Sequence, residues 1–228
     1  MGVVTGLASE AVVATALVGD DDLPVRIVCA GASNARAALL ARQFVDAGVE
    51  ALLSFGIAGA LDPALANGTL LVAKAVVTDE GESYTCDRDW QEALRGALAE
   101  TRQPCRQGAI LGSSRLWREP GDKSALFARM GCLAVDMESG AVAAIAAEAG
   151  LPFLAVRAVA DRAQDALPPL VEDAVKPDGM PAVWRTLGAL LWHPAQLPAT
   201  LRLARQSERA LARLRRLEAV RNELFGGF

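Results

Sequence analysis

The spacing of apolar and polar residues along the chain changes between two patterns, that of strands and that of helices. Short runs rich in Val, Ile and Leu predict strands, and the segments between them carry apolar residues at helical spacing. The predicted strands are Val3–Thr5, Arg26–Ala30, Ala51–Phe55, Leu70–Val77, Ala109–Leu111, Leu133–Val135 and Phe153–Val159. The predicted helices are Ala35–Ala47, Trp90–Glu100, Lys123–Met130, Ser139–Ala149, Pro181–Leu191 and Pro198–Leu224. Strands that alternate with helices in this way indicate an α/β fold.

No repeat, low-complexity segment or linker divides the 228 residues, and a chain of this length can bury a substantial core as a single domain. Apolar residues make up 52% of the chain but aromatic ones only 5%, which favours helices packed on a sheet over a β-sandwich. We therefore expect one α/β domain with a mixed, mostly parallel, twisted sheet flanked by helices, and a long C-terminal helix. Residues 1–165 would form its core, and residues 166–228 a divergent helical region of the same domain.

Small and acidic residues collect where the predicted strands end. Gly6, Gly31 and Gly56 follow three strands, and Asp136 and Asp161 end two others. Ligands of α/β sheets bind in the crevice beyond the carboxyl ends of the strands, so we expect a ligand site there. Taken singly, these acids could equally be helix caps or partners of a helix dipole.

The composition removes several classes of function. A net charge of −4 gives no reason to expect a nucleic acid partner, and the single histidine, His193, rules out a histidine-rich metal site. Four cysteines without CxxC spacing fit reduced thiols in a cytoplasmic protein. The chain shows neither a signal peptide nor an apolar run near the roughly 20 residues of a membrane helix. We expect no metal and no cofactor, and chemistry that depends on carboxylates.

Three motifs carry a resemblance to a known family. They are Val-Asp-Met-Glu-Ser-Gly-Ala-Val-Ala from residue 135, the strand from residue 151 that ends Val-Arg-Ala-Val-Ala-Asp, and the turn Gly-Ile-Ala-Gly-Ala-Leu from residue 56. Together they resemble the nucleoside phosphorylase/nucleosidase family, above all the methylthioadenosine/S-adenosylhomocysteine nucleosidases. The likeness covers roughly residues 2–165. It implies an enzyme that cleaves the N-glycosidic bond of a purine nucleoside and that usually assembles into homo-oligomers.

The resemblance implies a role for each acid. Glu138 would bind the ribose hydroxyls and stabilise the positive charge that develops on the sugar, with Met137 packed against the ribose. Asp161 would protonate the purine at N7 and accept a hydrogen bond from a 6-amino group, which suits adenine. Glu10 would activate the attacking water, although its register in the first loop is shortened and it could instead be only a helix-end acid. Further substrate-binding residues would be Asp136, Ile57, Ala58 and Gly59.

The two principal acids need different surroundings for this chemistry. Loss of the base leaves an oxocarbenium-like sugar, beside which Glu138 must be ionised. Asp161 must be neutral in order to donate its proton, which requires a dry site. Losing either group should therefore be severe.

Two loops bear on the nucleophile and on the base. The phosphorylase branch usually holds phosphate with an arginine in the first loop, and Gly6 to Glu10 contain none, which favours water. Ser33 and Arg36, at a predicted helix N-terminus, could still bind an anion, so phosphate remains a possible co-substrate. Trp117 could stack on the purine or could belong to the core.

The C-terminal region resembles the hopanoid-biosynthesis-associated phosphorylase branch, which implies adenosylhopane as the substrate. From Pro198 to the end there are seven arginines and three glutamates, and Leu203, Ala210, Leu214, Leu217 and Leu224 form one helical stripe. This helix could pack on the core or at a subunit contact, or it could approach an anionic inner membrane peripherally. The alternatives to adenosylhopane are methylthioadenosine or S-adenosylhomocysteine, a phosphate-dependent purine nucleoside phosphorylase, and a nucleoside-binding protein without activity.

Overall fold

The computed structural model describes residues 1–19, 24–169, 179–180 and 196–228. Within these ranges the strands form one eight-stranded sheet. They are β1 (Gly2–Thr5), β2 (Arg26–Cys29), β3 (Leu52–Ala60), β4 (Leu70–Thr78), β5 (Ser83–Thr85), β6 (Cys105–Gly112), β7 (Ala134–Asp136) and β8 (Phe153–Asp161). The helices are α1 (Ala8–Val18), α2 (Asn34–Asp46), α3 (Arg88–Glu100), α4 (Pro120–Met130), α5 (Ser139–Ala149), α7 (Leu197–Arg215) and α8 (Arg221–Gly226).

The sheet is mixed but mostly parallel, as the sequence predicts. β1 pairs in parallel with β2 and β3, β8 with β3, and β6 with β4 and β7, whereas β3–β7, β4–β5 and β4–β8 are antiparallel. Because β8 pairs with both β3 and β4, strands β3, β7, β6, β4 and β8 close into a ring of hydrogen-bonded neighbours. The result is a distorted barrel with β1, β2 and β5 as extensions.

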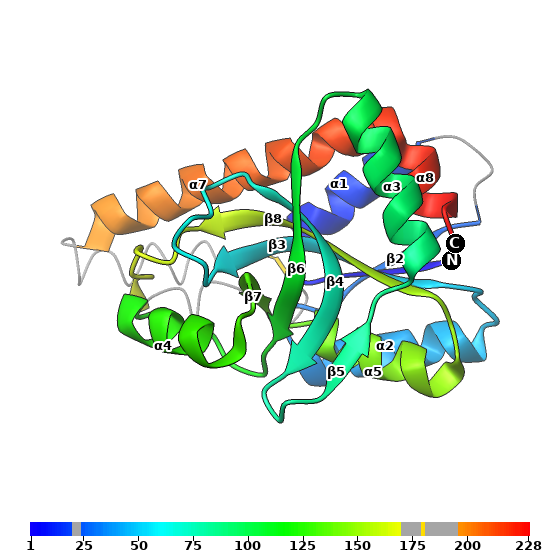
Figure 1. Ribbon diagram of the computed structural model, residues 1–228, viewed down its shortest axis with the longest axis horizontal. Coiled ribbons are helices and arrows are strands. Elements are labelled where there is room, and N and C mark those ends of the chain that lie inside the picture. Colours follow the sequence, from blue (N-terminus) through cyan, green and yellow to red (C-terminus); the bar gives the residue numbers. More distant parts are fainter. Residues whose placement is uncertain (20–23, 170–178, 181–195) are drawn as a thin grey trace.

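Helices cover the sheet on two sides (Figure 1). Helices α1, α3, α7 and α8 lie along one side, and α2, α4 and α5 lie along the other, with both chain termini on the right of the view. The core between them is built from fully buried residues of the strands, such as Val4, Leu53, Phe55 and Val156. The predicted α/β class is therefore confirmed.

Two elements are absent from the sequence prediction. Helix α1 has apolar residues on every side, and Val12 remains 68% exposed, so this segment has no amphipathic period to reveal it. Strand β5 is only three residues long, and Ser83 and Thr85 are exposed, so it shows no apolar run. The predicted helix Pro181–Leu191 lies outside the described residues.

The predicted long C-terminal helix is confirmed as α7, but its predicted range, Pro198–Leu224, is wrong as a single helix. Helix α7 ends at Arg215, a 3₁₀ turn follows over Arg216–Val220, and α8 completes the chain. The turn brings the chain end onto α3, where the buried indole of Trp90 donates from Nε1 to backbone carbonyls of α8 at 3.0 and 3.2 Å. The predicted apolar stripe is confirmed at Ala210, Leu214, Leu217 and Leu224, which are fully buried, whereas Leu203 is only half-buried.

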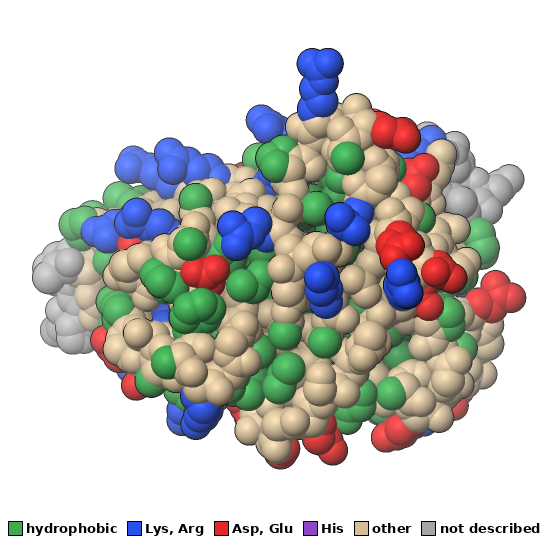
Figure 2. Space-filling view, viewed as in Figure 1, with side chains coloured by type: hydrophobic (Ala, Val, Ile, Leu, Met, Phe, Trp, Pro, Cys, Tyr) green, Lys and Arg blue, Asp and Glu red, His purple; other side chains and the backbone are tan. Residues whose placement is uncertain are grey.

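Exposed arginines of α7 face outward from the same helix. Arg202, Arg205 and Arg209 are exposed, and Figure 2 shows blue side chains over the part of the surface where α7 and β6 lie. No helix in the described part of the chain is long and apolar enough to cross a membrane.

Candidate active site

Strand pairing around Gly59 brings the ends of two other strands together. Gly59 pairs with Val135 of β7 on one side and with Asp161 of β8 on the other. The chain leaves β7 at Asp136 and enters α5 through Glu138, while β8 ends at Asp161 itself. The acids that the sequence places at strand ends therefore meet at one edge of the barrel.

Glu10 reaches this edge from the first turn of α1. One of its carboxylate oxygens, Oε2, accepts hydrogen bonds from the backbone amides of Gly6 and Leu7, both at 2.8 Å. The other, Oε1, accepts from the amide of Ile57 in β3, also at 2.8 Å. A Cβ at Gly56 would lie 2.6 Å from this carboxylate, so only glycine leaves room for it. Glu10 is thus more than a helix-end acid, since it ties α1 to β3.

Burial dominates the electrostatics of Glu10. The side chain is almost completely buried, and burial raises its pKa, although Arg157 and the three backbone amides act in the opposite direction. A carboxyl with a raised pKa accepts a proton more readily than an exposed one. This is the property that a base activating water requires.

Asp136 and Arg157 form a buried ion pair beneath the site. Asp136 Oδ1 accepts from the amides of Glu138 and Ser139 at 2.9 and 2.7 Å and so caps α5. Its Oδ2 lies 2.9 Å from Arg157 Nε, and Arg157 also donates to Ser54 Oγ at 2.6 Å. Both oxygens of Asp136 are thus engaged with protein donors, which makes it a support of the site's framework.

Glu138 lies next to this pair without being neutralised by it. Arg157 Nη2 is 3.9 Å from Glu138 Oε2, too far for a hydrogen bond. A Cβ at Gly6 would lie 2.5 Å from Oε1, so the first loop packs directly against the carboxylate. Burial, followed by the charge of Asp136, raises the pKa of Glu138 to about 8. Glu10, Asp136 and Glu138 thus share one guanidinium.

Asp161 belongs to a second charged group. Its Oδ2 lies 2.5 Å from the ammonium of Lys123 on α4, and a Cβ at Gly59 would lie 3.1 Å from its Oδ1. Burial raises the pKa of Asp161, while Lys123 opposes that rise. The direction agrees with an acid that holds its proton at higher pH than an ordinary aspartate.

Ser33 and Met137 line an open cavity of about 490 Å³ beside the acids, together with Ala32, Asn34, Ala35, Ala38, Ser114 and Ala141. Ser33 caps α2 by accepting from the amide of Arg36 at 3.3 Å. Ala32 adopts φ = 52°, a strained conformation for a residue other than glycine, and such strain is found most often near functional sites. Met137 adjoins Glu138 in sequence, so this cavity approaches the acid for which the sequence predicts contact with the ribose.

Trp117 packs into a small apolar cluster with Leu111, Leu126 and Val135. Its indole donates to Ser113 Oγ at 2.9 Å, and the Arg115 guanidinium lies 3.5 Å from the ring centroid. These contacts support the packing role that the sequence leaves open. Ala58 is likewise buried within β3.

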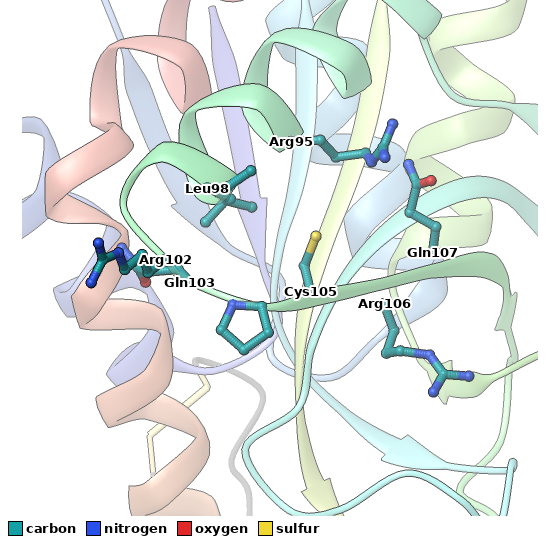
Figure 3. A pocket seen from close by; sticks show the side chains of 9 residues that line it. Arg95, Leu98, Arg102, Gln103, Cys105, Arg106 and Gln107 are labelled. Carbon is teal, nitrogen blue, oxygen red and sulfur yellow. The ribbon is translucent and has the colours of Figure 1, made fainter.

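A different cavity, of about 510 Å³, opens between α3 and the start of β6 (Figure 3). Arg95, Arg102 and Arg106 line it together with Cys105 and Gln107. The described residues that line it include no acid, and it lies at the opposite end of β6 from Gly112, which pairs with Asp136. It is therefore separate from the carboxylate site. No group of three metal-ligating side chains occurs within the described ranges.

Arg157 and Lys123 are the site residues that sequence reasoning missed. Arg157 is visible as a lone charge inside an apolar strand, a pattern that indicates a buried ion pair. Lys123 is one of three lysines beside twenty arginines, but nothing in its helical segment indicates a partner 38 residues away.

Residues 4–178 match the sequence profile of the Phosphorylase superfamily, and the chain belongs to this family. A DeoD-type purine nucleoside phosphorylase of Myxococcus xanthus is 30% identical over 124 residues, which are 50% of this chain and 52% of that protein. The chain thus matches about half the length of this curated relative.

Solved structures share the fold across nearly the whole chain. A mutant 5′-methylthioadenosine/S-adenosylhomocysteine nucleosidase of Helicobacter pylori, with 5′-methylthioadenosine in its active site, has a TM-score of 0.74 at 14% identity and covers 98% of this chain and 96% of its own. Futalosine hydrolase of the same organism has a TM-score of 0.72 at 16% identity, with 96% of both chains covered. An S-adenosylhomocysteine nucleosidase of Streptococcus pyogenes has a TM-score of 0.73 at 18% identity, covering 98% of this chain and 94% of its own.

Proposed function

We propose that this protein hydrolyses the N-glycosidic bond of an adenine nucleoside. The observation that carries the proposal is the placement of three buried carboxyls at one edge of the barrel: Glu10 and Glu138 share Arg157, and Asp161 ends β8 beside Gly59. Their environments differ, and acids in different environments can take different roles in one reaction.

The reaction follows from these positions. As the bond between C1′ and the purine nitrogen breaks, the bonding electrons leave with the base, and Asp161 delivers a proton to N7. Glu138 in its ionised form stabilises the oxocarbenium-like sugar. Because the pKa of Glu138 is raised to about 8, this form predominates only at alkaline pH, in contrast to the ionised state that the sequence predicts at neutral pH. Water adds to C1′, and its proton passes to Glu10. The products are adenine and the 5′-substituted ribose, whose C1 hydroxyl comes from the water, and no cofactor takes part.

The first loop favours water over phosphate as the nucleophile. Successive backbone amides before a helix make a natural anion site, but here each already has an acceptor. The amides of Gly6 and Leu7 donate to Glu10, and the amide of Ala8 donates to the carbonyl of Gly179 at 3.0 Å. A phosphate would face a carboxylate in place of free donors.

The C-terminal region supports a lipid-linked substrate, for which adenosylhopane is our first candidate. Met180, Leu197 and Leu201 are 49%, 44% and 47% exposed, which provides apolar surface for a hydrocarbon substituent. Helix α7, which carries Leu197 and Leu201, also has exposed arginines, which provide positive charge for peripheral contact with an anionic membrane. Methylthioadenosine and S-adenosylhomocysteine are the alternative substrates.

Adenine release from adenosylhopane and from methylthioadenosine, each with and without phosphate, tests the proposal. We expect release without phosphate, faster from adenosylhopane, and its loss in Glu138→Gln and Asp161→Asn. A wide margin for methylthioadenosine would refute the lipid substrate. Formation of ribose 1-phosphate, only when phosphate is added, would refute hydrolysis. If no nucleoside released its base, the protein would be a nucleoside-binding protein without activity.

A further inference from the structure

Lys123 is the least expected charge in the molecule. Its side chain is fully buried, although a buried ammonium is costly unless it is paired and hydrogen-bonded. A well-packed apolar residue would join α4 to the sheet at equal or lower cost, since buried ion pairs rarely add stability over such packing. The presence of the charge therefore calls for an explanation other than packing.

The contacts of Lys123 fix it as an ammonium aimed at one acid. Its Nζ lies 2.5 Å from Asp161 Oδ2, 3.0 Å from the carbonyl oxygen of Asp165 and 3.4 Å from that of Arg162. All three partners are acceptors, so three N–H donors are required. The ammonium thus holds one oxygen of the carboxyl and ties α4 to the loop that follows β8.

The remaining charges around Asp161 are compensated separately. Asp165 is the other charged group that acts on Asp161, and it is held by Arg162 at 3.0 Å and by Gln206 of α7 at 2.7 Å. Glu10 and Glu138 share Arg157 instead. Among the residues that the structure describes, Lys123 is the cation paired with Asp161. Asp161 keeps 5% of its surface exposed, so an edge of the carboxyl remains accessible.

We propose that Lys123 is the positioning residue of the acid: it holds Oδ2 of Asp161 and stabilises the carboxylate that remains after Oδ1 has given its proton to the departing purine. The proposal rests on the function proposed above. The balance is simple, because the proton moves from Asp161 to N7 while the proton count of Lys123 does not change. Lys123 makes Asp161 a stronger acid than burial alone would allow.

The test compares Lys123→Met, Lys123→Gln and the control Lys74→Met, an exposed lysine of β4. Asp161 must be protonated to act, so activity falls as pH rises through its pKa. A neighbouring cation lowers the pKa of an aspartate by roughly 1–3 units. Without the ammonium, we expect the alkaline limb of the pH profile of kcat to move up by about one pH unit or more. At pH values below that limb, kcat should fall about tenfold or more, which is part of the roughly 10²–10⁴-fold effect of a general acid. KM and the acid limb set by Glu138 should stay unchanged.

A second substrate separates positioning from a structural role. The leaving group of p-nitrophenyl riboside departs as an anion and needs no proton, so its hydrolysis should be spared in Lys123→Met, as in Asp161→Asn. If kcat fell equally on both substrates and the alkaline limb of the pH profile did not move, Lys123 would have only a structural role. Unchanged kinetics on both substrates would also overturn the proposal. Lys123→Gln keeps a donor to the carboxyl and serves if Lys123→Met does not fold, with melting followed by circular dichroism. A wild-type protein that releases no purine would refute the proposed function, and this role with it.

Discussion

Replacing Glu138 by Gln should abolish activity and stabilise the protein, with a pH dependence that identifies the cause. Burial and Asp136 raise the pKa of Glu138 from 4.5 to about 8. Between these values the folded protein holds a proton that the unfolded chain releases. The stability that neutral Glu138 contributes is fully present below about pH 4.5 and is lost as pH rises towards 8. Glutamine is neutral at every pH and keeps that stability.

The size of the effect follows from the same shift. Each pKa unit corresponds to about 1.4 kcal/mol, so the free energy of unfolding of the variant should exceed that of the wild type by on the order of 3 kcal/mol at pH 7. The difference should be near zero at pH 4.5 and should approach about 5 kcal/mol above pH 8. Most substitutions destabilise by roughly 0.5–3 kcal/mol, so a gain of this size at a buried position is diagnostic.

Urea unfolding of both proteins at pH 5, 6, 7, 8 and 9, followed by tryptophan fluorescence, measures the difference. Glu100→Gln, at an exposed acid of α3, is the matched control and should show no such slope. Adenine release measured on the same samples should be absent for Glu138→Gln at all pH values. A stability difference that is the same at pH 5 and pH 9 would show that Glu138 does not carry the cost, and our account of the site would fail.

Two further substitutions test the framework of the site. Arg157→Met leaves Asp136 and its neighbours without a cation, and urea unfolding should show the protein destabilised by about 3–5 kcal/mol. Part of this stability should return at low pH, because the carboxylates become protonated. An equal loss of stability at pH 5 and pH 8 would contradict this. Gly56→Ala places a Cβ 2.6 Å from the Glu10 carboxylate and should lower kcat by about 10²-fold, as a displacement near 1 Å can. Its control is Gly96→Ala, where a Cβ meets nothing within 4 Å; activity retained in both variants would remove Glu10 from the mechanism.

The sequence predicts this fold well wherever the buried residues form an apolar run or recur with the period of a helix. The seven predicted strands all occur, because their apolar runs are buried in the barrel. The prediction fails where this pattern is missing, or where contacts between residues distant in sequence determine the structure. Helix α1 has apolar residues on every side, and the end of the predicted helix Pro198–Leu224 is redirected by its contacts with Trp90, which lies more than 130 residues away.

The candidate site divides in the same way. The acids could be predicted because strand ends and motifs mark them in the sequence. Their partners could not, since the pairing of Lys123 with Asp161 depends on where α4 lies against the barrel. The roles of all the predicted site residues, the acids included, stay predictions, although the contacts of Trp117 favour packing.

The distribution of cations over the site suggests how it would favour a transition state. Asp161 has its own ammonium at 2.5 Å, whereas Glu10, Asp136 and Glu138 share Arg157, which hydrogen-bonds Asp136 and stays 3.9 Å from Glu138. If all three acids are ionised, the group around Arg157 lacks positive charge. An oxocarbenium-like sugar would supply that charge only while the glycosidic bond is breaking. Interactions that are stronger in the transition state than in the ground state are those that accelerate a reaction, so the under-compensated Glu138 is suited to the cationic sugar and the compensated Asp161 to the leaving base.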